Sequence, residues 1–164
     1  MIAKKSSCDY NHFMKNSLQT PVLKLDGYWP YQVTVLADRI ARRTSSIVKS
    51  HRLNLSQWRV LAAIAEEPGR TSVDVVTVTP MDKGIVSRAT KALIEMNLVR
   101  KEASQQDGRA SHLFLTHDGE STYAEVMPKI IDGLADARTL LSASEAKDLT
   151  SMLTHLKDAL PDLR

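Results

Sequence analysis

Five residues of the segment 83–91 have the types and the spacing to hold a phosphate backbone or a base edge. Lys83, Gly84, Ser87, Arg88 and Lys91 fall on one side of a predicted helix, opposite an apolar stripe. Arg88 can pair bidentately with a guanine or with a phosphate, Ser87 can donate or accept, and Gly84 lets the backbone approach closely. The alternative is the solvated side of an ordinary amphipathic helix.

A second candidate contact lies in the stretch 105–109, between two strand-like segments. Asp107-Gly108 is a strong hairpin signal, and it places Arg109 on an exposed turn. An arginine on a narrow β-ribbon can enter a minor groove, whose negative potential favours a guanidinium. Asp107 could hold and aim Arg109 through a charge-assisted hydrogen bond. The alternative is again a solvated turn residue.

No catalytic or metal-binding pattern accompanies these residues. The histidines at 12, 51, 112, 117 and 155 are scattered, and neither an HExxH nor a G-x-S-x-G motif occurs. Cys8 is the single cysteine, so an intramolecular disulfide and a cysteine metal cluster are excluded. We expect a protein that is not an enzyme, with no cofactor. A dimerisation adaptor without nucleic acid remains an alternative, although it would lack the basic face and the arginine-tipped turn.

Charge is unevenly distributed along the 164 residues, a length that favours one domain with appended helices. Residues 39–115 carry 13 Lys and Arg against 7 Asp and Glu, whereas residues 116–164 carry 5 against 9. A basic segment within a folded domain can attract a polyanion. No apolar run is long enough to span a bilayer and no signal peptide is evident, so we expect a cytoplasmic protein.

The elements that must position these residues can be read from periodicity and caps. Residues 29–52 are predicted to form a helix. Ser56 is predicted to be the N-cap of a second helix, which Pro68-Gly69 ends, and Asp82 is predicted to be the N-cap of the helix 83–96. Residues 71–81 stay ambiguous, because their valines favour a strand while Ser72 could cap a short helix. Strand-like segments 98–101 and 112–115 follow.

Two further helices complete the chain. One begins near Thr116–Glu120, where Pro128 should kink or offset it, and the other begins at Ser142 with Glu145 as a capping box. Residues 1–28 read as an arm, partly ordered or wrapped onto a partner subunit. The order helix, helix, short element, helix, hairpin is that of a winged helix-turn-helix. The predicted fold class is therefore mainly α with a small β-hairpin wing.

Several segments, in order, resemble the MarR family of transcriptional regulators. The stretch 55–61 is similar to the family's second-helix motif, and the stretch 81–93 is similar to its recognition helix. Residues 97–99 and 107–109 are similar to its wing, and residues 115–119 resemble the start of its fifth helix. The resemblance covers roughly residues 29–160. Two departures are Val75-Val76, where the family often has Leu-Ala, and Gly84, where it often has a small hydroxyl residue.

The resemblance implies a division of labour along the chain. Residues 55–116 would be the winged helix-turn-helix, with 71–81 as its first helix, and residues 29–54 and 117–164 would be dimerisation helices. A homodimer would bind pseudo-palindromic double-stranded DNA, with recognition helices about 34 Å apart. Ser87, Arg88 and Lys91 would read or hold the major groove and Arg109 the minor groove. The implied protein is a ligand-responsive repressor, although the sign of regulation stays open.

The resemblance also implies a small aromatic or phenolic effector, bound between the dimerisation and DNA-binding regions. Candidate lining residues are Trp29, Tyr31, His51, Trp58 and Arg59. Alternatively, Trp58 belongs to the core and Trp29 packs at the dimer interface. Some family members sense peroxides through a reactive cysteine, for which Cys8 would be the candidate here.

Overall fold

The computed structural model describes residues 22–103 and 111–160, and the chain divides into two compact units, 1–38 and 39–164. In the first unit, a short 3₁₀ helix (Leu25–Gly27) leads through Tyr28 into α1 (Trp29–Lys49), which continues into the second unit. The second unit continues with the helices and strands α2 (Leu55–Glu66), α3 (Ser72–Val78), α4 (Lys83–Glu95), β1 (Val99–Ala103), β2 (Ser111–Leu115), α5 (His117–Gly133), α6 (Ala135–Arg138) and α7 (Ala143–Ala159). The predicted class, mainly helical with a two-stranded hairpin, is confirmed.

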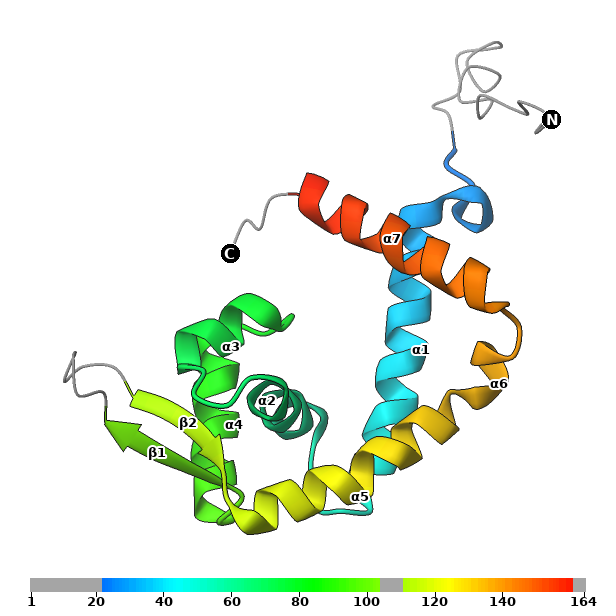
Figure 1. Cartoon of the computed structure of the whole chain (residues 1–164). Helices are drawn as coiled ribbons and strands as arrows, with labels where there is room; N and C mark the ends of the chain where they lie inside the picture. The colour runs from blue at the N-terminus through cyan, green and yellow to red at the C-terminus, as the bar shows by residue number, and fades with distance from the viewer. Residues whose placement is uncertain (1–21, 104–110, 161–164) are drawn as a thin grey trace. The chain divides into compact units, whose positions relative to one another are not determined.

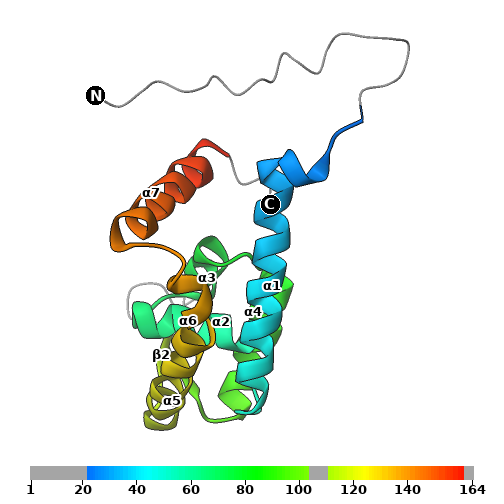
Figure 2. The same cartoon turned by 90° about the vertical axis from the view of Figure 1, so that its right-hand side faces the viewer.

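The hydrophobic core lies within the second unit and centres on α2 and α4. α2 buries Trp58, Val60, Leu61 and Ile64, while α4 buries Val86, Ala89 and Leu93. Figure 1 shows α2, α3 and α4 clustered together with the hairpin at the edge of this cluster, and the cluster stays together in the turned view of Figure 2. Such a core supplies the rigid support that a recognition surface needs.

The ambiguous segment 71–81 is resolved as a helix. Thr71 Oγ1 accepts from the Asp74 N–H and the Asp74 carboxylate accepts from the Thr71 N–H, which forms a capping box at the start of α3. Val75 is fully buried, and Thr79 Oγ1 donates to its carbonyl at 2.6 Å. Packing and capping therefore override the strand propensity of the valines. Thr71, rather than Ser72, is the cap.

The prediction that Ser56 caps α2 is wrong, because the cap is Asn54. Asn54 has extended backbone angles, its Oδ1 accepts from Gln57 N at 2.9 Å, and Gln57 Oε1 accepts from Asn54 N at 2.8 Å. This reciprocal pair begins the helix two residues earlier and leaves Ser56 within the first turn. The predicted caps at Asp82 and Ser142 are confirmed, and Thr116 caps the helix that was expected to begin near it.

α5 continues through Pro128 from His117 to Gly133. The hairpin pairs Val99 with Leu115 and Ala103 with Ser111 in antiparallel register. In the part of the chain that the structure describes, no helix combines the length and the apolar character that crossing a bilayer requires.

Candidate nucleic-acid interface

The five residues singled out on α4 all lie on its exposed side. Lys83, Gly84, Ser87, Arg88 and Lys91 are exposed. The opposite side of the helix is anchored in the core by the buried residues Val86, Ala89, Thr90 and Leu93. The sequence thus builds an amphipathic helix whose free side is basic and hydroxyl-bearing. This side can donate hydrogen bonds to phosphates and to base edges without disturbing the core.

The first turn of α4 is organised by Asp82, Gly84 and Arg88. Asp82 Oδ1 accepts from Ile85 N at 2.7 Å and caps the helix. A Cβ placed on Gly84 would lie 3.2 Å from Asp82 Oδ1 and 3.4 Å from Arg88 Nη1. The guanidinium of Arg88 therefore lies against the helix at the position where glycine has no side chain. Gly84 leaves room both for the cap and for this placement of Arg88.

Lys91 is positioned one turn beyond Ser87 and pairs with Glu95. The distance between Lys91 Nζ and Glu95 Oε1 is 3.8 Å, and the two side chains are 80% and 65% exposed. A pair this exposed contributes little to stability, so Lys91 can exchange its carboxylate for a phosphate at small cost.

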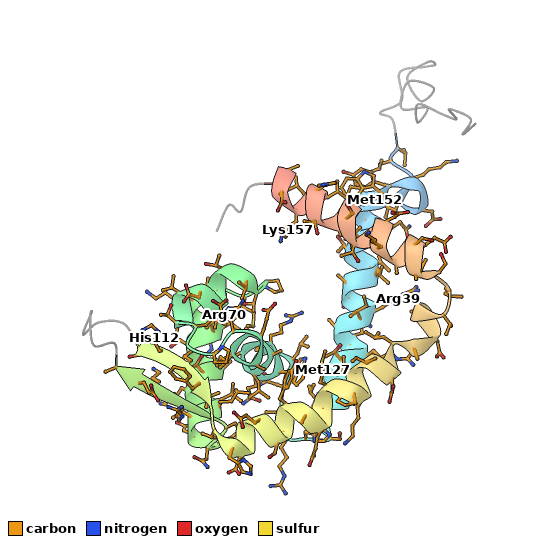
Figure 3. All side chains as sticks on the ribbon, viewed as in Figure 1. Arg39, Arg70, His112, Met127, Met152 and Lys157 are labelled. Atoms are coloured by element: carbon orange, nitrogen blue, oxygen red, sulfur yellow. The ribbon has the colours of Figure 1, made fainter. Side chains whose placement is uncertain are left out.

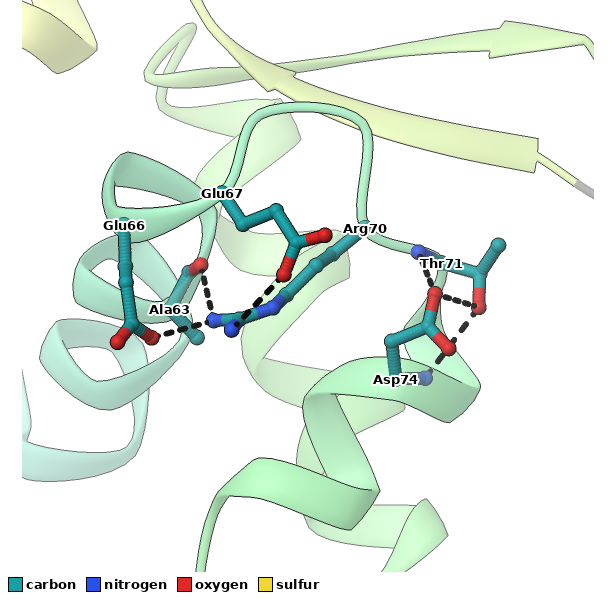
Figure 4. A network of polar contacts seen from close by, with 6 residues as sticks. All are labelled: Ala63, Glu66, Glu67, Arg70, Thr71 and Asp74. Atoms are coloured by element: carbon teal, nitrogen blue, oxygen red, sulfur yellow. Dashed lines mark hydrogen bonds and ion pairs between the residues drawn. The ribbon is translucent and has the colours of Figure 1, made fainter.

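The loop before α3 is stiffened by a network around Arg70 (Figure 4). Arg70 Nη1 donates to the Ala63 carbonyl and to Glu66 Oε2, both at 2.7 Å, and Nη2 lies 3.1 Å from Glu67 Oε2. The hydrogen bond to Glu66 raises the pKa of Arg70 above its ordinary value. Arg70 thereby ties the loop to the C-terminal turn of α2, where the Ala63 carbonyl also accepts from the Glu67 N–H at 3.4 Å.

The wing is described only at its two strands. Arg100 lies over the Phe114 ring, with its guanidinium carbon 4.8 Å from the ring centroid, and it pairs with Glu102. The tip residues Asp107 and Arg109 lie outside the described residues, so their proposed roles rest on the sequence.

A hollow of about 410 Å³ adjoins α4 on the side of α3 and β1. Besides Ser87 and Lys91, which the sequence had indicated, it is lined by Ser72 and Lys101. Thr90 also lines it, and Thr90 Oγ1 is buried without a hydrogen-bond partner among the described residues. Ser72 and Lys101 escaped sequence reasoning because they belong to elements that only the fold brings beside α4.

The candidate effector residues have different environments. Trp58 is buried in the core and stacks on Tyr123, with ring centroids 5.5 Å apart. Lys129 Nζ donates to His51 Nε2 at 3.0 Å, and Glu125 Oε2 lies 3.6 Å from His51 Nδ1. Arg59 is half-buried on α2.

Trp29 and Tyr31 belong to the first unit, where they are 50% and 40% exposed. In residues 22–103 and 111–160 no group of three or more His, Cys, Asp or Glu side chains is placed to hold a metal ion. Cys8 lies outside the described residues.

Comparison with known proteins shows which family this arrangement of helices and hairpin resembles. Residues 52–110, which include α2, α3, α4 and β1, match the model of the MarR family. This segment of the chain is similar to the MarR family. The family resemblance noted in the sequence is therefore confirmed.

A relative and a solved structure extend the match beyond this segment. The HTH-type transcriptional regulator MgrA of Staphylococcus aureus is 29% identical over 110 residues, which cover 67% of this chain and 74% of MgrA. A MarR-family regulator from Silicibacter pomeroyi superposes with a TM-score of 0.77 at 21% identity, over 84% of this chain and 93% of that one. The MarR-family fold thus includes the flanking helices as well as the domain.

Two further solved structures are similar to this chain. A variant of MarR from E. coli, complexed with operator DNA, has a TM-score of 0.67 at 20% identity and covers 80% of this chain and 93% of that one. BpsR of Bordetella bronchiseptica, whose DNA binding is regulated by 6-hydroxynicotinic acid, has a TM-score of 0.73 at 20% identity, over 84% and 98%. At these identities the likeness establishes the common fold.

Proposed function

We propose that this MarR-family protein is a homodimeric, sequence-specific DNA-binding transcriptional regulator and that it acts as a ligand-responsive repressor. The observation that carries the proposal is the exposed basic side of α4, a helix whose sequence resembles the recognition helix of the family. Ser87, Arg88 and Lys91 would contact the major groove, with Lys83 and Gly84 at the start of the helix against the backbone. MarR, which shares the fold, has been crystallised with operator DNA.

The apolar side chains exposed on the terminal helices support the dimer. In the first unit, α1 exposes Val33 and Leu36, and in the second unit α7 exposes Leu149, Met152 and Leu153. α7 contains no buried residue. Apolar side chains that gather on the exposed face of a helix are typical of surfaces that a partner covers. A second copy of this chain is the partner that a pseudo-palindromic operator requires.

An effector site remains part of the proposal. The effector would be a small aromatic or phenolic molecule, and the candidate lining residues remain those proposed from the sequence: Trp29, Tyr31, His51, Trp58 and Arg59. BpsR, whose DNA binding responds to 6-hydroxynicotinic acid, is a structural neighbour with this type of effector.

The proposal is tested by selecting bound DNA from a random duplex pool with the purified full chain. We expect enrichment of a pseudo-palindrome, with an affinity that falls steeply as salt increases because phosphate contacts release counterions. Repeating the selection with a panel of hydroxylated aromatic acids tests the effector. No enriched sequence at low salt without ligand would contradict the regulator function.

Arg88→Ala tests the assignment of the recognition surface. On the selected operator we expect a loss of about 1–3 kcal/mol if Arg88 pairs bidentately with a base. Lys49→Ala is the matched control, since Lys49 is an exposed cation in the last turn of α1. Equal losses of operator affinity in the two variants would show a general effect of charge and would exclude Arg88 from the residues that recognise the operator.

A further inference from the structure

The loop between α2 and α3 is bonded to the hairpin along three consecutive residues. Gly69 N donates to the Leu113 carbonyl at 2.9 Å, Leu113 N donates to the Arg70 carbonyl at 3.0 Å, and Thr71 forms a β-bridge with His112. Residues 69–71 therefore act as a short third strand beside β2. A two-stranded hairpin is marginally stable by itself, so this edge supplies support that β1 and β2 lack.

His112 adds a side-chain hydrogen bond to this edge. Its Nδ1 lies 2.7 Å from the Gly69 carbonyl oxygen, and the residue is half-buried. A carbonyl oxygen only accepts hydrogen bonds, so Nδ1 carries the hydrogen. Figure 3 shows His112 on β2 and Arg70 on the neighbouring loop. The imidazole thus fastens the distal half of β2, close to the wing tip, to the helix-turn-helix.

The acceptor of this bond is held rigidly in turn. Gly69 has a φ of +94°, which favours glycine, and a Cβ at this position would lie 3.5 Å from the Phe114 ring. On the C-terminal side, Arg70 ties the loop to α2 through the Ala63 carbonyl and Glu66, and Thr71 ties it to α3 through Asp74. The loop is therefore tied to both α2 and α3, the two helices that pack against α4.

We propose that His112 is a positioning residue for DNA binding, which fixes the root of the wing relative to α4. This inference rests on the proposed function. A wing and a recognition helix that act on neighbouring grooves must be held in one relative geometry before binding, because ordering them on the DNA would cost affinity. His112 supplies this order through its bond to Gly69 without touching the DNA.

The inference is first tested without DNA, by amide hydrogen exchange of the full chain. His112→Phe keeps a planar ring and removes the donor, while His112→Asn keeps an N–H donor near the position of Nδ1. We expect the Leu113 and Gly69 amides to exchange several-fold faster in His112→Phe, with α4 amides unchanged. His112→Asn should restore most of the protection. Unchanged exchange at both amides in His112→Phe would overturn the inference.

The second test is a double-mutant cycle with Arg109→Ala on the selected operator. His112→Phe should lower affinity on the order of 3- to 10-fold, as expected for one lost hydrogen bond, and should have no further effect in the Arg109→Ala background. Additive losses, or full affinity of His112→Phe, would overturn the positioning role. If the wild-type chain selects no DNA, the proposed function fails, while the exchange experiment still decides whether His112 anchors the wing.

Discussion

At the residue scale, two glycines of α5 show how closely that helix is packed. A Cβ on Gly119 would overlap the Leu98 carbonyl oxygen, which belongs to the backbone before β1. A Cβ on Gly133 would lie 2.6 Å from Ile47 Cδ1, the end of a flexible side chain. Gly119 therefore permits a backbone-to-backbone contact where the hairpin enters α5, whereas the contact at Gly133 can relax by a rotation of Ile47.

This difference predicts opposite tolerances to alanine. Gly119→Ala should destabilise the fold by about 1–3 kcal/mol or more, because the backbone at Leu98 must move. Gly133→Ala is the matched control and should be close to neutral, since the better helix propensity of alanine offsets the small rearrangement. Urea unfolding followed by circular dichroism measures both values. Similar losses in the two variants would contradict this account of the packing.

At the scale of the element, the capping box of α3 is sensitive to acid. Hydrogen bonds from the Thr71 backbone and hydroxyl lower the pKa of the Asp74 carboxyl below its ordinary value of 3.8. A carboxylate with a lowered pKa stabilises the folded state above the unfolded pKa, and this contribution is lost as the pH falls through the folded pKa. α3 is only seven residues long, so its cap matters for the support of α4.

Asp74→Asn should therefore reduce stability at neutral pH and not in strong acid. We expect a loss of about 0.5 kcal/mol at pH 7, typical of a charge in the first turn of a helix, which disappears as the pH is lowered past 3.8. Glu145→Gln is the control, because the Ser142 bonds lower the pKa of Glu145 in the same way but α7 has no buried residue. Urea titrations at several pH values measure the difference in the free energy of unfolding between each variant and the wild type. A loss of stability in Asp74→Asn that persists in acid would contradict a stabilising role for the charge of Asp74.

At the scale of the whole molecule, the proposed dimer should depend on the apolar side of α7. Leu153 is 44% exposed on this helix, and burying a leucine against a partner contributes about 1.5–3 kcal/mol. Leu153→Asp should shift the protein from dimer to monomer and weaken operator binding, because two linked recognition helices bind more tightly than one. Ser151→Asp introduces the same charge at a neighbouring exposed position. Light scattering after size exclusion distinguishes the outcomes, and an unchanged dimer in Leu153→Asp would exclude this surface.

The sequence by itself determined the features that depend on neighbours three or four residues away. The Asp82 cap, the exposed side of α4 and the Ser142–Glu145 box follow from local hydrogen bonds and helical periodicity, which is why all five candidate residues of α4 were found correctly on its free side. The pairing of the two strands was predicted from the strand-like segments on either side of Asp107-Gly108.

Tertiary structure decided what local preference left open or misjudged. The valines of α3 form a helix because Val75 is buried against the core. The bond from His112 to Gly69 joins residues 43 apart, and the contact of Gly119 with Leu98 joins α5 to the hairpin. Such contacts depend on chain closure over long separations, which no periodicity in the sequence encodes.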